Sequence, residues 1–120
     1  RDTLTLYPIG YIILTMSYLI QTTDEFSNWL AKLRDRRAKA KIIIRLQRVE
    51  QGNFGDYKSV GGGVSELRIT EGAGYRLYYT MQGDVIVIML AGGDKSTQQQ
   101  DIEKAKQIKG GLNHEQNDTI

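Results

Sequence analysis

The sequence has no cysteine, one histidine and one proline among its 120 residues. Without cysteine the chain forms no disulfide bond and offers no thiolate ligand to a metal ion, and the lack of disulfides fits a reducing cytoplasm. The single histidine, His114, lies in a polar stretch near the C-terminus. Catalysis by histidine and metal sites rich in histidine are therefore not expected.

A single domain of ordinary globular composition is predicted from the length, with 40% hydrophobic and 25% charged residues. The formal net charge is only +2, but the charge is unevenly distributed. Residues 34–50 carry seven basic and two acidic side chains, a local net charge of +5. A basic field of this kind attracts polyanions or an acidic protein partner.

The first twenty residues include an apolar stretch, LTLYPIGYIILTMSYLI, that is similar in hydrophobicity to the core of a signal peptide. Pro8 and Gly10 interrupt it, it is short for a membrane span, and no clear small-residue cleavage site follows. Met16 is the expected natural start of the protein. We expect residues 1–15 to be upstream or non-native sequence, and the alternative is an extension that packs on the domain.

A helix is predicted directly after a short strand at residues 17–21. Thr22 followed by Glu25 matches a capping box at the helix start. Apolar residues then recur at helical spacing, at Phe26, Trp29, Leu30 and Leu33. This helix should therefore pack through one face.

A second helix, over about residues 36–51, is predicted to complete a helix hairpin. Asp35 can cap it, and Gly52 is a natural stop. Its apolar face holds Ala38, Ile42, Leu46 and Val49, widened by Ile43. A parallel row of cations, here called the basic stripe, holds Arg37, Lys41, Arg45 and Arg48. Such a stripe is by default a solvated helix face, and contact with nucleic acid is the alternative.

The second half of the chain is predicted to form an antiparallel sheet. A loop is expected at residues 52–63, and strands at residues 64–70, 75–81 and 85–91. A three-residue hairpin loop that ends at Gly74 pairs Ile69 with Leu77. In this register Arg68 and Arg76 stand on one face as diagonal neighbours.

The last predicted strand is apolar on both faces, as is typical of a central strand. A tight two-residue turn within MQGD (81–84) is expected to lead into it. In that register the helices meet Ile86, Ile88 and Leu90. Val87 and Met89 then lie beside Tyr78 and Arg76.

The stretch LAGGDKSTQQQDIEKA (90–105) is similar in layout to a phosphate-binding P-loop, with a strand, glycines, a lysine and a helix start. The P-loop motif needs glycine directly before its lysine, and Asp94 precedes Lys95 here. A nucleotide site is therefore excluded. Two interpretations of the stretch are left, namely a simpler anion-binding site at the helix start and a solvated loop with a helix cap. Ser96 with Gln99 predicts a capping box, and residues 110–120 read as a frayed or flexible tail.

A cluster of three cations is predicted on the sheet face. Arg68 and Arg76 share that face beside Tyr78, and Lys95 follows the strand end nearby. Such a cluster suits a phosphate group, and ordinary solvated arginines are the alternative.

The ordered set ELR, GYRLYY and GGDKSTQQQDI, within about residues 16–108, resembles the RelE/ParE superfamily of bacterial toxins. The nearest branch is that of the HigB-like addiction module killer proteins, related to phage proteins. The resemblance implies an α+β RelE-like fold over residues 16–109, with an N-terminal helix hairpin on a small antiparallel sheet and a C-terminal helix.

The same resemblance implies a ribosome-dependent endoribonuclease of a type II toxin–antitoxin module, acting in the cytoplasm without cofactor or metal. The RNA 2′-OH attacks the adjacent phosphate, which leaves a 2′,3′-cyclic phosphate and a 5′-OH. The implied partners are mRNA on the ribosome and a helix-turn-helix, HigA-like antitoxin, with no membrane and with DNA reached only through the antitoxin.

Site residues follow from the resemblance. Arg68, Arg76 and Lys95 fall where relatives carry phosphate-contacting or catalytic cations. Some relatives carry a C-terminal tyrosine where Asp101 stands here, so Tyr78, Asp94 and Asp101 are the candidates for proton transfer or RNA contact. Candidates for binding RNA or antitoxin are the basic stripe and Lys58. The alternative function is a ParE-like toxin that binds DNA gyrase and cuts no RNA.

Overall fold

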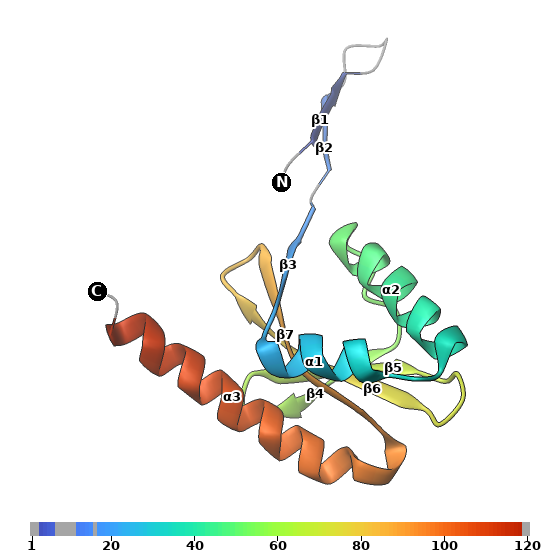
Figure 1. Ribbon diagram of the computed structural model, residues 1–120. Helices are drawn as coiled ribbons and strands as arrows, with labels where there is room; N and C mark the ends of the chain where they lie inside the picture. The colour runs from blue at the N-terminus through green and yellow to red at the C-terminus, as the bar shows by residue number, and fades with distance from the viewer. Residues whose placement is uncertain (1–2, 7–11, 16, 119–120) are drawn as a thin grey trace.

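The computed structural model describes the backbone of residues 3–6, 12–15 and 17–118 and the side chains of residues 17–112 (Figure 1). A five-stranded sheet with strand order β3-β7-β6-β5-β4 forms the centre. Its strands are β3 (Leu19–Thr22), β4 (Tyr57–Gly61), β5 (Val64–Ile69), β6 (Tyr75–Gln82) and β7 (Ile86–Asp94). The helices are α1 (Asp24–Lys32), α2 (Arg36–Glu50) and α3 (Gln98–Asp118), with a short 3-10 helix at Lys95–Thr97.

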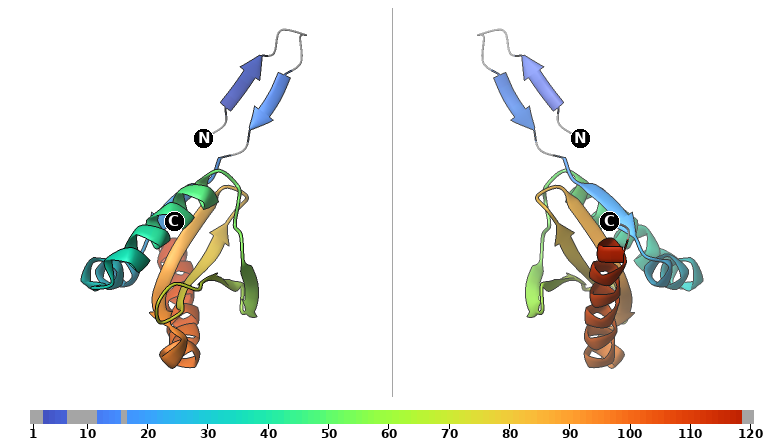
Figure 2. Two further views of the ribbon diagram at one scale, coloured as in Figure 1. Left: turned by 90° about the vertical axis from the view of Figure 1, so that its right-hand side faces the viewer. Right: turned by 90° about the vertical axis from the view of Figure 1, so that its left-hand side faces the viewer.

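Helices cover both faces of this sheet. The helices α1 and α2 pack on one face around Phe26, Ile42, Leu67 and Leu77, and α3 packs on the other over Tyr78 and Leu90. Figure 2 shows α3 on the opposite side of the sheet from the helix hairpin. The predicted α+β architecture with a helix hairpin and a C-terminal helix is confirmed.

Near the N-terminus, β1 (Thr3–Leu6) and β2 (Ile12–Thr15) pair with each other in a separate antiparallel sheet. This hairpin projects from the rest of the molecule (Figures 1 and 2). Met16, the expected start, lies outside the described residues. In the described part of the chain no helix is long and apolar enough to cross a membrane.

The helix caps differ from expectation at the first helix. Thr23, not Thr22, caps α1, and its hydroxyl oxygen accepts from the Phe26 amide at 3.1 Å while the hydroxyl donates to the Leu90 carbonyl at 2.8 Å. The bond to β7 places Thr23 at the helix start, a tertiary contact that local sequence does not reveal. Asp35 caps α2 as predicted, accepting from the Ala38 amide at 3.0 Å.

The predicted widening of the α2 apolar face is wrong. Ile43 is 44% exposed, because α2 meets the sheet through Ala38, Ile42 and Val49, with Leu46 partly buried beside them. Gly52, with φ of 92°, follows the helix end at Glu50 as expected.

The register between β5 and β6 is shifted by two residues from the prediction. Ile69 pairs with Tyr75 and Leu67 with Leu77, so the loop spans residues 70–74. Gly72 and Gly74 both have positive φ, which lets the chain turn over this longer loop. An even shift keeps every side chain on its predicted face, but it sets Arg68 directly opposite Arg76 rather than diagonal to it.

The register between β6 and β7 is shifted by an odd number of residues at the turn, so the predicted faces of residues 86–90 are exchanged. Gln82 pairs with Ile86 across a three-residue loop in which Gly83 has φ of 66°. As a result, Val87 and Met89 face α1 and α2, whereas Ile88 and Leu90 face α3. A bulge between Tyr78 and Tyr79 changes the register again toward the strand end.

Two further expectations about strands need correction. Residues 52–63 are not all loop, because β4 pairs there with β5 as an edge strand. The sheet is not wholly antiparallel, because β3 runs parallel to β7. No hairpin joins β3 to β7, so the connection imposes no antiparallel direction on this pair.

The double glycine at the end of β7 admits one large group on each face of the sheet. A Cβ at Gly92 would collide with the indole of Trp29, and one at Gly93 would collide with the carboxylate of Asp101. Neither glycine has positive φ, so space rather than backbone conformation requires them.

The start of α3 also differs from the predicted capping box. Asp94, not Ser96, caps the preceding 3-10 helix and accepts from the Ser96 amide at 2.8 Å. The helix then continues to Asp118, where a tail without regular structure was expected after residue 109.

Candidate active site

Three cations from three parts of the sheet line one pocket. Arg68 on β5 and Arg76 on β6 face each other across the strand pair, and Lys95 follows directly after β7. The pocket has a volume of about 350 Å³. Its lining residues are Asp56, Arg68, Thr70, Gly72, Gly74, Arg76 and Lys95. The fold therefore brings the predicted cation cluster together.

Glycine at position 74 lets Lys95 reach this pocket. A Cβ there would lie 2.9 Å from Cδ of Lys95, so the lysine side chain packs directly over the bare backbone. The left-handed φ of 79° at Gly74 turns the β5–β6 loop under the lysine. One residue thus serves both the hairpin turn and the position of the cation.

Arg68 forms an ion pair with an acidic residue that the sequence did not single out. Oδ1 of Asp56 accepts from Nε of Arg68 at 3.3 Å and from Nη2 at 3.2 Å. The Asp56 carboxylate is 53% exposed, so it lies at the mouth of the pocket. Asp56 belongs to a segment read as loop, and no local pattern in that segment indicates its tertiary neighbours.

The side chain of Arg76 is more deeply buried than that of Arg68. Its Nη1 donates to the backbone carbonyls of Gly74 at 3.4 Å and Tyr75 at 3.3 Å. Its Nε lies 3.9 Å from Oε2 of Glu66, a carboxylate with no exposed surface. Glu66 also accepts from Nε2 of Gln98 at 3.1 Å and lies 4.0 Å from Nζ of Lys58.

Strand alternation places Glu66 on the same face as Arg68, and Glu66 is buried because α3 covers that face. Alternation along the strand gave the correct face for Glu66 but could not show that a helix covers it. Lys58, predicted to bind RNA or antitoxin, lies on the edge strand β4, where its exposed side chain approaches Glu66.

The three predicted candidates for proton transfer do not line the cation pocket. Tyr78 has no exposed surface, and burial, followed by the nearby Glu66 carboxylate, raises the pKa of its hydroxyl. Asp101 is 8% exposed and accepts from the Thr97 hydroxyl at 2.6 Å. Hydrogen bonds from Ser96 lower the pKa of Asp94, which caps the 3-10 helix.

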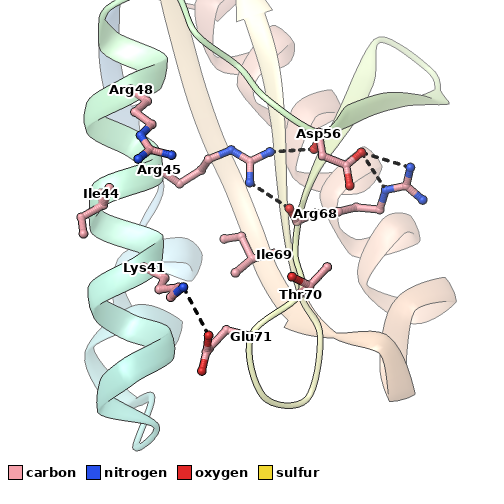
Figure 3. Close-up of a pocket in the computed structure, with 9 residues that line it drawn as sticks. All are labelled: Lys41, Ile44, Arg45, Arg48, Asp56, Arg68, Ile69, Thr70 and Glu71. Atoms are coloured by element: carbon pink, nitrogen blue, oxygen red, sulfur yellow. Dashed lines mark hydrogen bonds and ion pairs between the residues drawn. The ribbon is translucent and has the colours of Figure 1, made fainter.

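The basic stripe of α2 divides into two kinds of side chain (Figure 3). Arg45 points toward the sheet and donates to the carbonyls of Phe54 at 3.1 Å, Arg68 at 2.8 Å and Asp56 at 2.7 Å. Burial lowers the pKa of Arg45 from its usual value. It therefore ties the loop after α2 and strand β5 to the helix.

The remaining stripe residues are exposed. Arg37 and Lys41 lie 4.0 Å and 3.5 Å from the carboxylate of Glu71, and Arg48 lies seven residues beyond Lys41, about two turns further along the helix. Both ion pairs involve largely exposed cations, so each contributes little to stability.

A second pocket of about 370 Å³ adjoins the first. Lys41, Arg45 and Arg48 line it from α2. It shares Asp56, Arg68 and Thr70 with the cation pocket, so the two form one surface from α2 to Lys95. Figure 3 shows Arg68 beyond Asp56 on the side of this pocket away from α2. A surface lined by cations over two adjoining pockets suits a chain of phosphates better than a single anion.

Among the side chains of residues 17–112, no three of the His, Cys, Asp or Glu type gather at a place where they could hold a metal ion. The chemistry that the pocket itself offers is the binding of phosphate oxygens by guanidinium and ammonium groups.

Comparison with known proteins gives the family and the fold of the chain. Residues 28–109 match the model of the family described as phage-derived protein Gp49-like, and the chain belongs to that family. The architecture is the RelE-like fold. A mutant of the E. coli toxin RelE in the free state superposes with a TM-score of 0.58, at 17% identity, over 74% of this chain and 98% of that one.

An uncharacterized protein of Haemophilus influenzae is 57% identical to this chain over 91 residues, which is 76% of this chain and 92% of the relative. The matched region takes in most of the chain, so the relative and this protein share the domain described above.

Proposed function

We propose that this protein is the toxin of a type II toxin–antitoxin module and that it cuts mRNA on the ribosome, as a HigB-like member of the RelE/ParE superfamily acting in the cytoplasm. The observation that carries this proposal is the single pocket lined by Arg68, Arg76 and Lys95. The RelE-like fold and the Gp49-like family support it.

The pocket can supply what phosphodiester cleavage needs without a cofactor. When a 2′-OH attacks the neighbouring phosphate, negative charge builds on the non-bridging oxygens, and three preorganised cations stabilise that charge. The ribosome would hold the RNA in the attacking geometry, which lowers the entropic part of the barrier. Losing one such preorganised donor typically costs about 10²–10³ in rate.

The proposed partner in the resting cell is a helix-turn-helix antitoxin with an acidic segment. The surface best suited to it runs over the second pocket, where Lys41 and Arg48 are exposed beside Arg68. An antitoxin seated there would exclude RNA from the cation pocket, because the two pockets share Arg68.

Primer extension on mRNA from cells that express the protein tests the activity. Wild type should produce cuts within translated codons, and Arg68→Ala and Lys95→Ala should abolish them. Lys104→Ala is the matched control, because this exposed lysine pairs with Glu25 of α1 and lines neither pocket. Intact mRNA with broken DNA would instead identify a gyrase poison and refute the nuclease.

A further inference from the structure

We propose that Asp56 is the general base that takes the proton from the attacking 2′-OH. The inference rests on the proposed nuclease function and names the group that this reaction still lacks. It follows from where the fold places the carboxylates of the domain around the cation pocket.

Asp56 is the one carboxylate among the described residues that line the pocket with Arg68, Arg76 and Lys95. It also lines the adjoining pocket beside α2. A phosphate bound by Arg68 would therefore sit next to a carboxylate, and so would the 2′-OH that attacks it. General-base catalysis requires this proximity, because the base must reach the proton by a hydrogen bond.

The backbone and the side chain of Asp56 are both held in place. Its carbonyl accepts from the Arg68 amide at 2.9 Å and from Nη2 of Arg45 at 2.7 Å. Its Oδ1 accepts two hydrogen bonds from the Arg68 guanidinium. Within the described part of the chain, Oδ2 receives no hydrogen bond, so one carboxylate oxygen is oriented and the other is open to accept a proton.

The other acidic candidates are placed elsewhere. Asp101 is buried on α3 against Gly93, Glu66 is buried in the sheet beneath α3, and Asp94 is engaged by Ser96 at the helix start. Glu71 lines only the second pocket, where it pairs with Lys41. Of the acidic residues whose side chains the structure describes, Asp56 alone combines exposure with contact to an arginine of the cation pocket.

The proposed step balances as follows. The 2′-OH proton moves to Oδ2 of Asp56, and the electron pair of that O–H bond forms the new bond from O2′ to phosphorus. The bond from phosphorus to O5′ breaks with its electron pair on O5′, which takes a proton from Lys95. Of the three cations only the lysine can release a proton, since guanidinium stays protonated. Exchange with water then returns both groups to their starting states.

The test is single-turnover cleavage of mRNA in ribosome complexes by the purified full chain. Asp56→Asn keeps the backbone contacts and an oxygen for Arg68 but cannot accept the proton. A positioned base typically contributes about 10²–10⁴ in rate, so we expect a loss of about 10²-fold or more at unchanged affinity for an mRNA with a 2′-deoxy nucleotide at the cleavage site. Asp84→Asn, in the exposed turn between β6 and β7, should cut like wild type.

A substrate with sulfur in place of the leaving 5′-oxygen distinguishes a base from an acid. A thiolate leaves without a proton, so the defect of Lys95→Ala should shrink on this substrate, while the defect of Asp56→Asn should persist. If sulfur removes the Asp56→Asn defect, Asp56 serves the leaving group and the proposal is wrong. Equal or faster cleavage by Asp56→Asn would also overturn the proposal, because the only effect of Asp56 would then be to pair with the Arg68 guanidinium and compete with phosphate for it. If wild type cuts no mRNA, the proposed function fails and the inference fails with it.

Discussion

Arg45 joins three backbone segments beneath the candidate site, and we predict that Arg45→Met destabilises the domain by about 3 kcal/mol. Its three hydrogen bonds reach the carbonyls of Phe54, Asp56 and Arg68. Methionine keeps most of the aliphatic volume but removes every donor. The variant therefore isolates the hydrogen bonds from the packing of the side chain.

The magnitude follows from the environment of each bond. The bond to Asp56 is exposed, so water can replace it at little cost. The bonds to Phe54 and Arg68 are part-buried, and a hydrogen bond to a charged group contributes about 1.5 kcal/mol at the lower end of its range. Two such bonds give the predicted loss of about 3 kcal/mol.

Urea denaturation followed by circular dichroism measures this loss. With a slope near 2 kcal/mol per molar urea, a typical value for a small domain, the midpoint should fall by about 1.5 M. Arg48→Met is the control on the same helix, because that side chain is exposed and should change stability by less than about 0.5 kcal/mol. If the two variants have the same midpoint, Arg45 does not anchor the site and belongs with the solvated part of the basic stripe.

Three further variants test the sheet face that α3 covers. Gly93→Ala should lower the free energy of unfolding by about 1–3 kcal/mol, measured in urea, because its Cβ collides with the Asp101 carboxylate. Glu66→Gln should cost about 3 kcal/mol by the same assay, because it leaves the buried guanidinium of Arg76 without its counter-charge; a loss below 0.5 kcal/mol would show that the 3.9 Å pair carries no weight. Tyr78→Phe should keep RNA cleavage, and a loss of cleavage would return Tyr78 to the catalytic candidates. Since burial raises the pKa of Tyr78, its contribution to stability is complete below the unfolded pKa near 10 and declines as pH rises toward the folded value, by at most about 1.4 kcal/mol per pH unit. Melting in alkaline buffers should therefore show a shallower decline for Tyr78→Phe than for wild type.

Errors in the predicted strand registers had unequal consequences. The two-residue shift between β5 and β6 left Arg68 and Arg76 on their predicted face, because side chains alternate with period two. The odd shift between β6 and β7 exchanged Val87 and Met89 with Ile88 and Leu90. Turn length decides such registers, and glycines such as Gly83 permit several lengths.

The sequence by itself determined the helix hairpin, the α+β class and the identity of the three clustered cations. Periodicity, the Asp35 cap and strand alternation are local properties, so they can be read without knowing what packs where. The sequence also predicted that Lys95 lies at a strand end near two strand arginines. The presence of Asp94 directly before Lys95 excluded a P-loop.

Only the tertiary structure shows which charged side chains are engaged by other residues of the domain. Arg45 looks like its exposed neighbours in sequence, yet it donates hydrogen bonds to three backbone carbonyls. Lys58 is exposed, and only the fold shows that it lies near the buried Glu66. Asp56 lies in a segment without local pattern, and only the pairing of β4 with β5 brings it to Arg68. Burial and ion pairing depend on residues distant in the chain, and one sequence contains no direct record of those distances.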